Sequence, residues 1–146
     1  MRIIYNITGF LLAASLMAGC VRKNDVLPPV KLPPGGKGGK AKIVVTPQHH
    51  KTNLNTAMVY IKYASTVMPD VNTFDDSAAV TFELGRPAAT FKDLTQGDYY
   101  LYAKGTDFEL EPGKDQVMGG ATFRVIDTLE KTYDLYLQTD NHIHHD

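Results

Sequence analysis

Residues 91–103 of the chain, Phe-Lys-Asp-Leu-Thr-Gln-Gly-Asp-Tyr-Tyr-Leu-Tyr-Ala, contain the pattern that decides the fold. An apolar approach ending at Leu94 runs into a turn, where Gly97 can adopt a positive φ without a Cβ clash. Beyond the turn the side chains alternate, with one set to each side: Tyr99, Leu101 and Ala103, against Asp98, Tyr100 and Tyr102. Alternation with a period of two after a glycine turn predicts a half-buried β-strand.

Short apolar segments separated by turn residues continue this pattern along the chain. We expect strands at residues 41–46, 57–63, 79–84, 90–91, 98–104, 121–126 and 132–138. The pair Gly119-Gly120, which opens the sixth of them, is a candidate β-bulge. Several short strands with regular turn signals and no helical period predict an all-β sandwich or barrel.

The same alternation predicts the core. The expected core side chains are Ile43, Val45, Val59, Ile61, Tyr63, Val80, Phe82, Leu84, Phe91, Leu94, Tyr99, Leu101, Phe123, Val125, Tyr133, Leu135 and Leu137. Each large apolar side chain contributes about 1.5–3 kcal/mol on burial. A core of this size can support one domain without a disulfide.

Two of these strands resemble a known family of modules. Residues 91–103 have an F-x-x-L-x-x-G-x-Y-x-L-x-A pattern, and the earlier strand at residues 57–61 has an A-x-V-x-I pattern. Both patterns resemble prealbumin-like β-sandwiches, which include carboxypeptidase regulatory-like and collagen-binding B-type repeats. The resemblance implies an all-β, seven-stranded Greek-key sandwich, prealbumin-like or immunoglobulin-like. Because Pro47-Gln48-His49-His50 follows the first strand here, in place of the short turn of many such repeats, we expect a different ligand surface.

The beginning of the chain is typical of a targeting segment. Residues 1–19 contain a basic Arg2, a short apolar stretch and small residues before Cys20, which is the only cysteine. The run Met17-Ala18-Gly19-Cys20 resembles a bacterial lipobox, which implies that Cys20 is lipidated and becomes the first residue of the mature chain. An ordinary signal peptide followed by an incidental free cysteine is the alternative.

Four segments follow from this interpretation. Residues 1–19 are the lipoprotein signal peptide, 20–40 the lipidated cysteine and a Pro/Gly-rich tether, 41–140 the β-sandwich domain, and 141–146 a His-rich tail. Acyl chains on the cysteine would anchor the protein to a membrane. We therefore expect a membrane-anchored lipoprotein of the cell envelope, in the outer membrane of a Gram-negative bacterium.

Charge and motifs narrow the function classes. With 15 basic and 16 acidic residues the chain has no basic excess, so no nucleic-acid partner is expected. No G-x-S-x-G, H-E-x-x-H or phosphate-loop motif occurs, and we expect no enzyme activity. The expected function is that of a lipid-anchored cell-envelope binding or scaffold protein.

All five histidines fall into two clusters, each just beyond a predicted strand end. One cluster is His49 and His50, and the other is His142, His144 and His145. The first and last strands of many sandwiches of the resembled type run side by side and parallel, which would bring the clusters together. Neutral imidazole is a good ligand for zinc, copper or nickel. A histidine-mediated transition-metal-binding lipoprotein is therefore the alternative function, and solvated polar ends are the other interpretation.

Outward positions of the predicted strands carry several aromatic side chains: Tyr60, Tyr100, Tyr102 and Tyr136. Exposed aromatics on a sheet can form a binding face for peptide or sugar. The expected partner is therefore an envelope protein or a glycan, unless a loop or the tether covers these rings. The acidic loop at residues 70–76 carries oxygen side chains that either bind calcium or are simply solvated.

Overall fold

The structure, a computed structural model, describes residues 33–70, 72–83, 85–112, 115–127 and 129–141. The chain divides into two compact units, Met1–Val30 and Lys31–Asp146, and every described residue belongs to the second. The predicted signal peptide, Cys20 and the tail histidines lie outside the described residues. Within the described part, no helix is long and apolar enough to cross a membrane.

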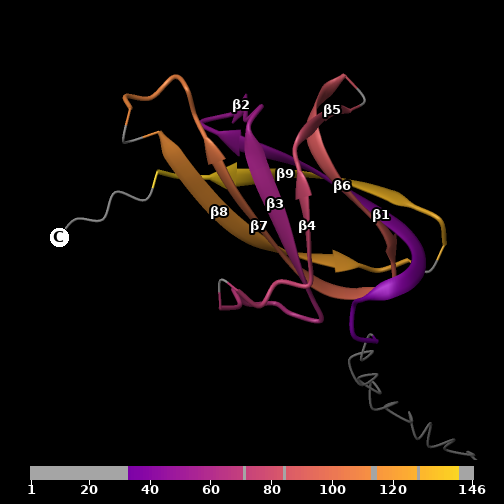
Figure 1. Cartoon of the computed structure of the whole chain (residues 1–146). Coiled ribbons are helices and arrows are strands. Elements are labelled where there is room, and N and C mark those ends of the chain that lie inside the picture. The colour runs from indigo at the N-terminus through magenta and orange to yellow at the C-terminus, as the bar shows by residue number, and fades with distance from the viewer. Residues whose placement is uncertain (1–32, 71, 84, 113–114, 128, 142–146) are drawn as a thin grey trace, which may run out of the picture. The chain divides into compact units, whose positions relative to one another are not determined.

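The described residues form nine β-strands and no helix, arranged as a β-sandwich of two sheets (Figure 1). In chain order the strands are β1 (Lys37–His49), β2 (Thr52–Asn53), β3 (Ala57–Tyr63), β4 (Asp76–Ala79), β5 (Thr81–Glu83), β6 (Arg86–Leu94), β7 (Gly97–Thr106), β8 (Gln116–Val125) and β9 (Thr132–Thr139). The all-β class is confirmed. The strand count exceeds the predicted seven because β2 is added and the predicted strand at 79–84 is divided into β4 and β5.

The two sheets differ in strand order. One has the order β2-β1-β6-β5, with β9 also paired to β1, and the other has the order β4-β3-β7-β8. Every pair between these strands is antiparallel except that of β1 with β9. These two run parallel, with Lys42 opposite Thr132 and His49 opposite Thr139. The residues that follow β1 and those that follow β9 therefore leave the sandwich at the same end.

Strand β7 is central to the second sheet, and its alternation is as expected. Tyr99, Leu101 and Ala103 are buried and face the other sheet, while Tyr100 and Tyr102 on the opposite face are half-buried. Apolar side chains from both sheets meet between the layers. The buried cluster consists of Ala41, Ile43, Val45, Val59, Ile61, Ala89, Phe91, Leu94, Tyr99, Leu101, Ala103, Val125 and Leu137.

The predicted core is wrong at Phe82, which is 77% exposed. The chain changes sheets at Val80: β4 pairs with β3 in one sheet, and β5 pairs with β6 in the other. Figure 1 shows the β5–β6 hairpin projecting beyond the neighbouring strands. Phe82 lies on this hairpin opposite Pro87, where the other sheet does not cover it. Leu84, another predicted core residue, lies outside the described residues.

The segment before β1 is fixed to the turn that precedes β7. The hydroxyl of Tyr99 accepts a hydrogen bond from the backbone N of Gly36 at 2.9 Å and donates one to the carbonyl of Thr95 at 2.6 Å. Gly97 has a φ of 147°, and a Cβ at this position would collide with the backbone of Gly35. Strand β1 consequently begins at residue 37, earlier than the predicted start at residue 41.

Candidate functional site

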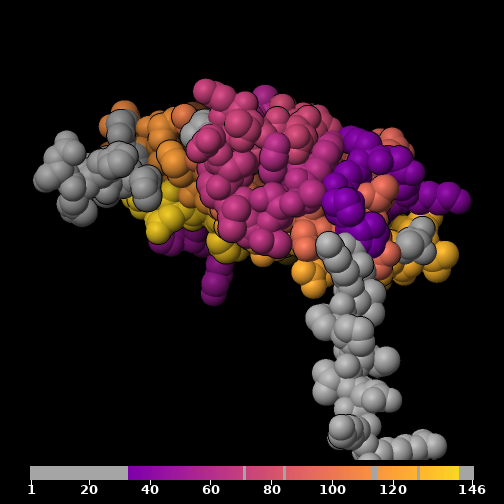
Figure 2. All heavy atoms as spheres, turned by 90° about the horizontal axis from the view of Figure 1, so that it is seen from below, coloured from indigo at the N-terminus to yellow at the C-terminus, as the bar shows by residue number. Residues whose placement is uncertain are grey.

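Three aromatic rings pack together on the outer face of the four-stranded sheet. Tyr60 of β3 lies opposite Tyr102 of β7, and their ring centroids are 6.2 Å apart. Phe74, from the segment between β3 and β4, packs 5.3 Å from Tyr60 and 5.8 Å from Tyr102, stacked on the latter at 15°. These three rings, together with Tyr100 on the same face, are named the tyrosine face. Figure 2 shows the segment around β3 and β4, in magenta, covering the middle of the surface seen from below.

Tyr100 reaches across the sheet toward β8. A Cβ placed on Gly120 would meet the Tyr100 hydroxyl, so the tyrosine ring lies over the bare backbone of this glycine. A Cβ on Gly119 would instead meet the carbonyl oxygen of Gln138 in β9. The β7–β8 register runs through both glycines without a shift, so the predicted bulge at this pair is absent. The glycines permit close approach, of a ring at one position and of a strand at the other.

A hollow of about 410 Å³ adjoins Tyr60 and Phe74, and its other lining residues are polar: Asn72, Asp75, Asp76 and Ser77. The carboxylate of Asp75 accepts hydrogen bonds from the backbone N of Tyr63 at 2.7 Å and from the Lys62 ammonium at 3.1 Å. The acidic loop is therefore organised by bonds to its own chain. Among the described residues no three His, Cys, Asp or Glu side chains converge as metal ligands.

The hydroxyls of Tyr63 and Tyr102 stay protonated at neutral pH. Burial, and then the nearby carboxylates of Asp76 and Asp75, raise the pKa of Tyr63 to about 12. Burial, and then the neighbouring Tyr100 and Tyr60, raise the pKa of Tyr102. The surface thus offers ring faces and neutral hydroxyls beside carboxylates, which is a surface suited to uncharged polar ligands.

Tyr136 is not part of the tyrosine face. It lies on β9, in the other sheet, and is 52% exposed. The guanidinium of Arg86 stands 5.7 Å from its ring centroid, at cation–π distance. The other three tyrosines singled out from the sequence, Tyr60, Tyr100 and Tyr102, lie on one face of the four-stranded sheet. The structure adds Phe74, whose loop position carries no strand pattern that could have revealed it.

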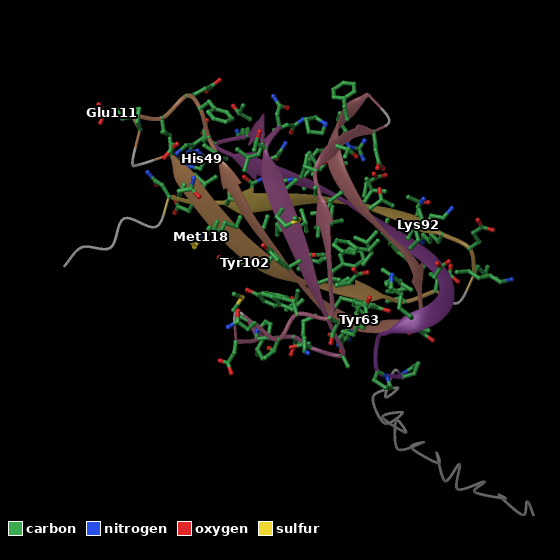
Figure 3. All side chains as sticks on the ribbon, in the orientation of Figure 1. His49, Tyr63, Lys92, Tyr102, Glu111 and Met118 are labelled. Atoms are coloured by element: carbon green, nitrogen blue, oxygen red, sulfur yellow. The ribbon has the colours of Figure 1, made fainter. Side chains whose placement is uncertain are left out.

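A second cluster lies where β1 ends. His49 is only 1% exposed, and its Nδ1 is 2.7 Å from Oδ2 of Asp107 (His49 is labelled in Figure 3). The backbone N of Glu109 donates to the same carboxylate at 3.0 Å. This backbone bond, and then the imidazole, hold the pKa of Asp107 below its usual range. The carboxylate is therefore charged, and from this contact we assign a proton to Nδ1 of His49, which donates it to Asp107.

The other ring nitrogen of His49 is unusual. Nε2 is buried and has no hydrogen-bond partner. In metal sites and in catalytic triads, a carboxylate bound to Nδ1 orients the imidazole, and Nε2 faces the metal or the nucleophile. No hydroxyl bonds to this Nε2, however. Asp107 escaped sequence reasoning because it lies 58 residues from His49 and outside any motif.

His50 and Lys51 form the two-residue turn between β1 and β2. His49 pairs with Thr52, and the two turn residues have φ values of 47° and 70°. Two successive positive φ values define a type I′ hairpin turn, for which Asn-Gly is the preferred sequence. A residue with a side chain in the left-handed region costs about 1–2 kcal/mol. His50 is exposed, and its ring centroid is 4.0 Å from that of His49.

The end of β9 lies beside this turn. Thr139 is opposite His49, and the next residue, Asp140, exchanges two backbone hydrogen bonds of 2.9 Å with Met118 of β8. A hollow of about 480 Å³ is lined by His50, Lys51, Met118, Gly119, Gly120, Gln138, Thr139 and Asp140. Figure 3 shows His49 and Met118 toward the same end of the sandwich. The expected parallel pairing thus places His50 and Asp140, the residue just after β9, at one hollow.

Neither the models of known protein families nor the curated proteins compared with the chain match it.

Proposed function

We propose that the protein is a lipid-anchored binding or scaffold protein of the bacterial cell envelope, without catalytic activity, and that the tyrosine face is its ligand surface. The observation that carries the proposal is the cluster of Tyr60, Phe74 and Tyr102 on an outer sheet face. Aromatic side chains usually fill cores, and a half-buried aromatic cluster beside a polar hollow is a common feature of binding surfaces.

The ligand we propose is an uncharged glycan of the envelope. Ring faces pack against the apolar face of a sugar, and the carboxylates and amide of the adjoining hollow accept hydrogen bonds from sugar hydroxyls. The protonated hydroxyl of Tyr102 can donate. The carboxylates of Asp75 and Asp76 are paired with the ammonium groups of Lys62 and Lys37, so the hollow presents balanced charge, which favours a neutral sugar over a charged peptide.

We further propose that the sandwich is a prealbumin-like Greek key and that Cys20 carries the lipid. The parallel pairing of β1 with β9 is the arrangement expected for such modules and supports the first proposal. Pro33, where the described chain begins, is 13 residues from Cys20 by sequence number. An extended chain spans at most about 3.6 Å per residue, so such a tether could hold the domain up to about 45 Å from the membrane.

Anchoring is tested by fractionation. Cys20→Ser should move the protein from the outer-membrane fraction of a Gram-negative host to the soluble periplasm, because the acyl chains are the proposed anchor. Unchanged partition of this variant into the membrane would overturn the lipoprotein proposal.

Ligand binding is tested with an array of neutral and uronic-acid oligosaccharides. We expect the full chain to bind neutral sugars more tightly than acidic ones, and Tyr102→Ala to reduce this binding at least about tenfold, or 1.4 kcal/mol. The matched control is Tyr136→Ala, which removes a tyrosine from the other sheet and should leave binding unchanged. No binding to any sugar, or equal loss in both variants, would reject the tyrosine face as a glycan site.

A further inference from the structure

The connection between β8 and β9 exposes two large apolar side chains, Ile126 at 63% and Leu129 at 69%, which we name the apolar pair. Hydrogen bonds fix the backbone at both positions. Nε2 of Gln96 donates to the carbonyl of Ile126 at 3.0 Å, and the backbone N of Leu129 donates to the carboxylate of Asp127 at 2.9 Å. Single exposed apolar side chains are common on protein surfaces, so the pair indicates a partner only together with its position in the fold.

The apolar pair lies at the end of the sandwich where the described chain begins. Gln96, which bonds to Ile126, also lines a hollow of about 370 Å³ together with Pro33-Pro34, the first described residues. On the other side of the connection, the carbonyl of Lys131 accepts a hydrogen bond of 2.8 Å from the backbone N of Lys42 in β1. Figure 1 shows the start of β1, in indigo, on the same side of the sandwich as this connection, in yellow. The chain therefore enters the domain beside the apolar pair.

This end of the sandwich is the one that a lipid anchor would hold nearest the membrane. The inference rests on the proposed lipidation of Cys20, which precedes Pro33 by 13 residues in the sequence. A tether of this length keeps the domain within about 45 Å of the bilayer. Such confinement raises the effective concentration of the nearby surface, so a weak affinity of two apolar side chains for lipid becomes sufficient.

The charged groups of the connection permit contact with lipid. Glu130 is paired with the ammonium of Lys42 at 3.6 Å, and the Asp127 carboxylate already accepts the bond from the backbone of Leu129. Lys131 follows and is exposed, and a lysine at a bilayer surface keeps its ammonium among the head groups while its stem covers apolar surface. The apolar pair can thus approach a bilayer with both carboxylates of the connection partnered.

We propose that the β8–β9 connection rests on the bilayer to which the protein is anchored, with Ile126 and Leu129 inserted at the level of the lipid head groups. The partner is a phospholipid surface that is bound through apolar contact and not through a basic patch. The connection lies at an end of the sandwich, whereas the tyrosine face lies on a side of it, so this contact leaves the tyrosine face open to a glycan.

The chain contains no tryptophan, so one introduced tryptophan reports on its own surroundings. Leu129→Trp places this probe in the apolar pair. Phe82→Trp is the matched control, because Phe82 is 77% exposed but lies on the hairpin that begins β6, and β6 reaches the tether end only at Leu94. The lipidated full chain would be reconstituted in phosphatidylcholine vesicles, with and without bromine atoms on the upper part of the acyl chains.

On reconstitution, the emission of Leu129→Trp should shift to shorter wavelength and should be quenched by the brominated lipid. The emission of Phe82→Trp should show neither effect. Adding Ile126→Ser to Leu129→Trp should reduce the quenching, because the substitution removes the other member of the apolar pair. Since both side chains are exposed, circular dichroism of these variants should match that of the unmodified protein.

Three results would overturn the proposal for a chain that floats with the vesicles. One is a Leu129→Trp emission that brominated lipid does not quench. Another is equal quenching of Leu129→Trp and Phe82→Trp, which would mean that the domain has no preferred orientation. The third is an equally shifted emission when Leu129→Trp is combined with Cys20→Ser and measured without vesicles, which would assign the apolar pair to contact between copies of the chain. A chain that does not float at all would reject the anchor itself, and this inference with it.

Discussion

Nδ1 of His49 lies 2.7 Å from Oδ2 of Asp107, and this contact joins the two sheets at one end of the sandwich. His49 ends β1 in one sheet, and Asp107 directly follows β7 in the other. Both side chains are buried. A hydrogen bond to a charged group contributes about 1.5–3 kcal/mol, and a buried partner left unpaired is costly. This pair is therefore expected to hold the β1–β2 hairpin against the end of β7.

The first prediction is that this contribution depends on pH. The pKa of Asp107 is lowered in the folded protein, so the stabilisation is fully present above the unfolded value of about 3.9 and is lost as pH falls through the lower folded value. Urea unfolding should show Asp107→Asn to be less stable than the unmodified protein at pH 7. The difference should shrink as pH falls below about 4. Glu83 and Asp98 also have lowered pKa values, so only the difference between the two proteins isolates Asp107. A difference independent of pH would contradict this.

The second prediction contrasts two residues that the sequence places in the core. Leu101 is fully buried between the sheets, and Leu101→Ala should lower the free energy of unfolding by about 2–5 kcal/mol. Phe82 is exposed on the β5–β6 hairpin, and Phe82→Ala should stay within about 0.5 kcal/mol of the unmodified protein. Chemical denaturation monitored by circular dichroism measures both. Comparable losses for the two variants would mean that the hairpin is covered in solution.

This contrast marks how far the sequence alone leads. Alternation identifies which face of a strand is apolar, and it correctly placed Leu101 in the core. Alternation does not tell which sheet a strand joins, so the change of sheets at Val80 and the exposure of Phe82 could not be foreseen. The candidate site could likewise be predicted only in part from the sequence. The outward positions of Tyr60 and Tyr102 follow from strand periodicity. The contact of Asp107 with His49 does not, because it joins residues that lie 58 positions apart in the chain.

The third prediction separates the two glycines of β8. Gly119→Ala should be the more destabilising, because its Cβ would meet the backbone carbonyl of Gln138, which cannot move without shifting β9. Gly120→Ala would meet the end of the Tyr100 side chain, which can rotate away. Thermal unfolding of the two variants should therefore give the lower midpoint for Gly119→Ala. Equal midpoints would show that β8 and β9 are less closely joined than their backbone bonds at Met118 imply.

The last prediction concerns the turn at His50 and Lys51. Replacing both residues by the preferred type I′ pair, His50→Asn with Lys51→Gly, should stabilise the protein. Asparagine tolerates a left-handed backbone better than histidine does, and glycine has no Cβ to clash there. We expect a gain of about 1–2 kcal/mol in the free energy of unfolding. Urea unfolding of the double variant and of the unmodified protein measures this difference. A double variant that is less stable than the unmodified protein would show that the turn is not strained.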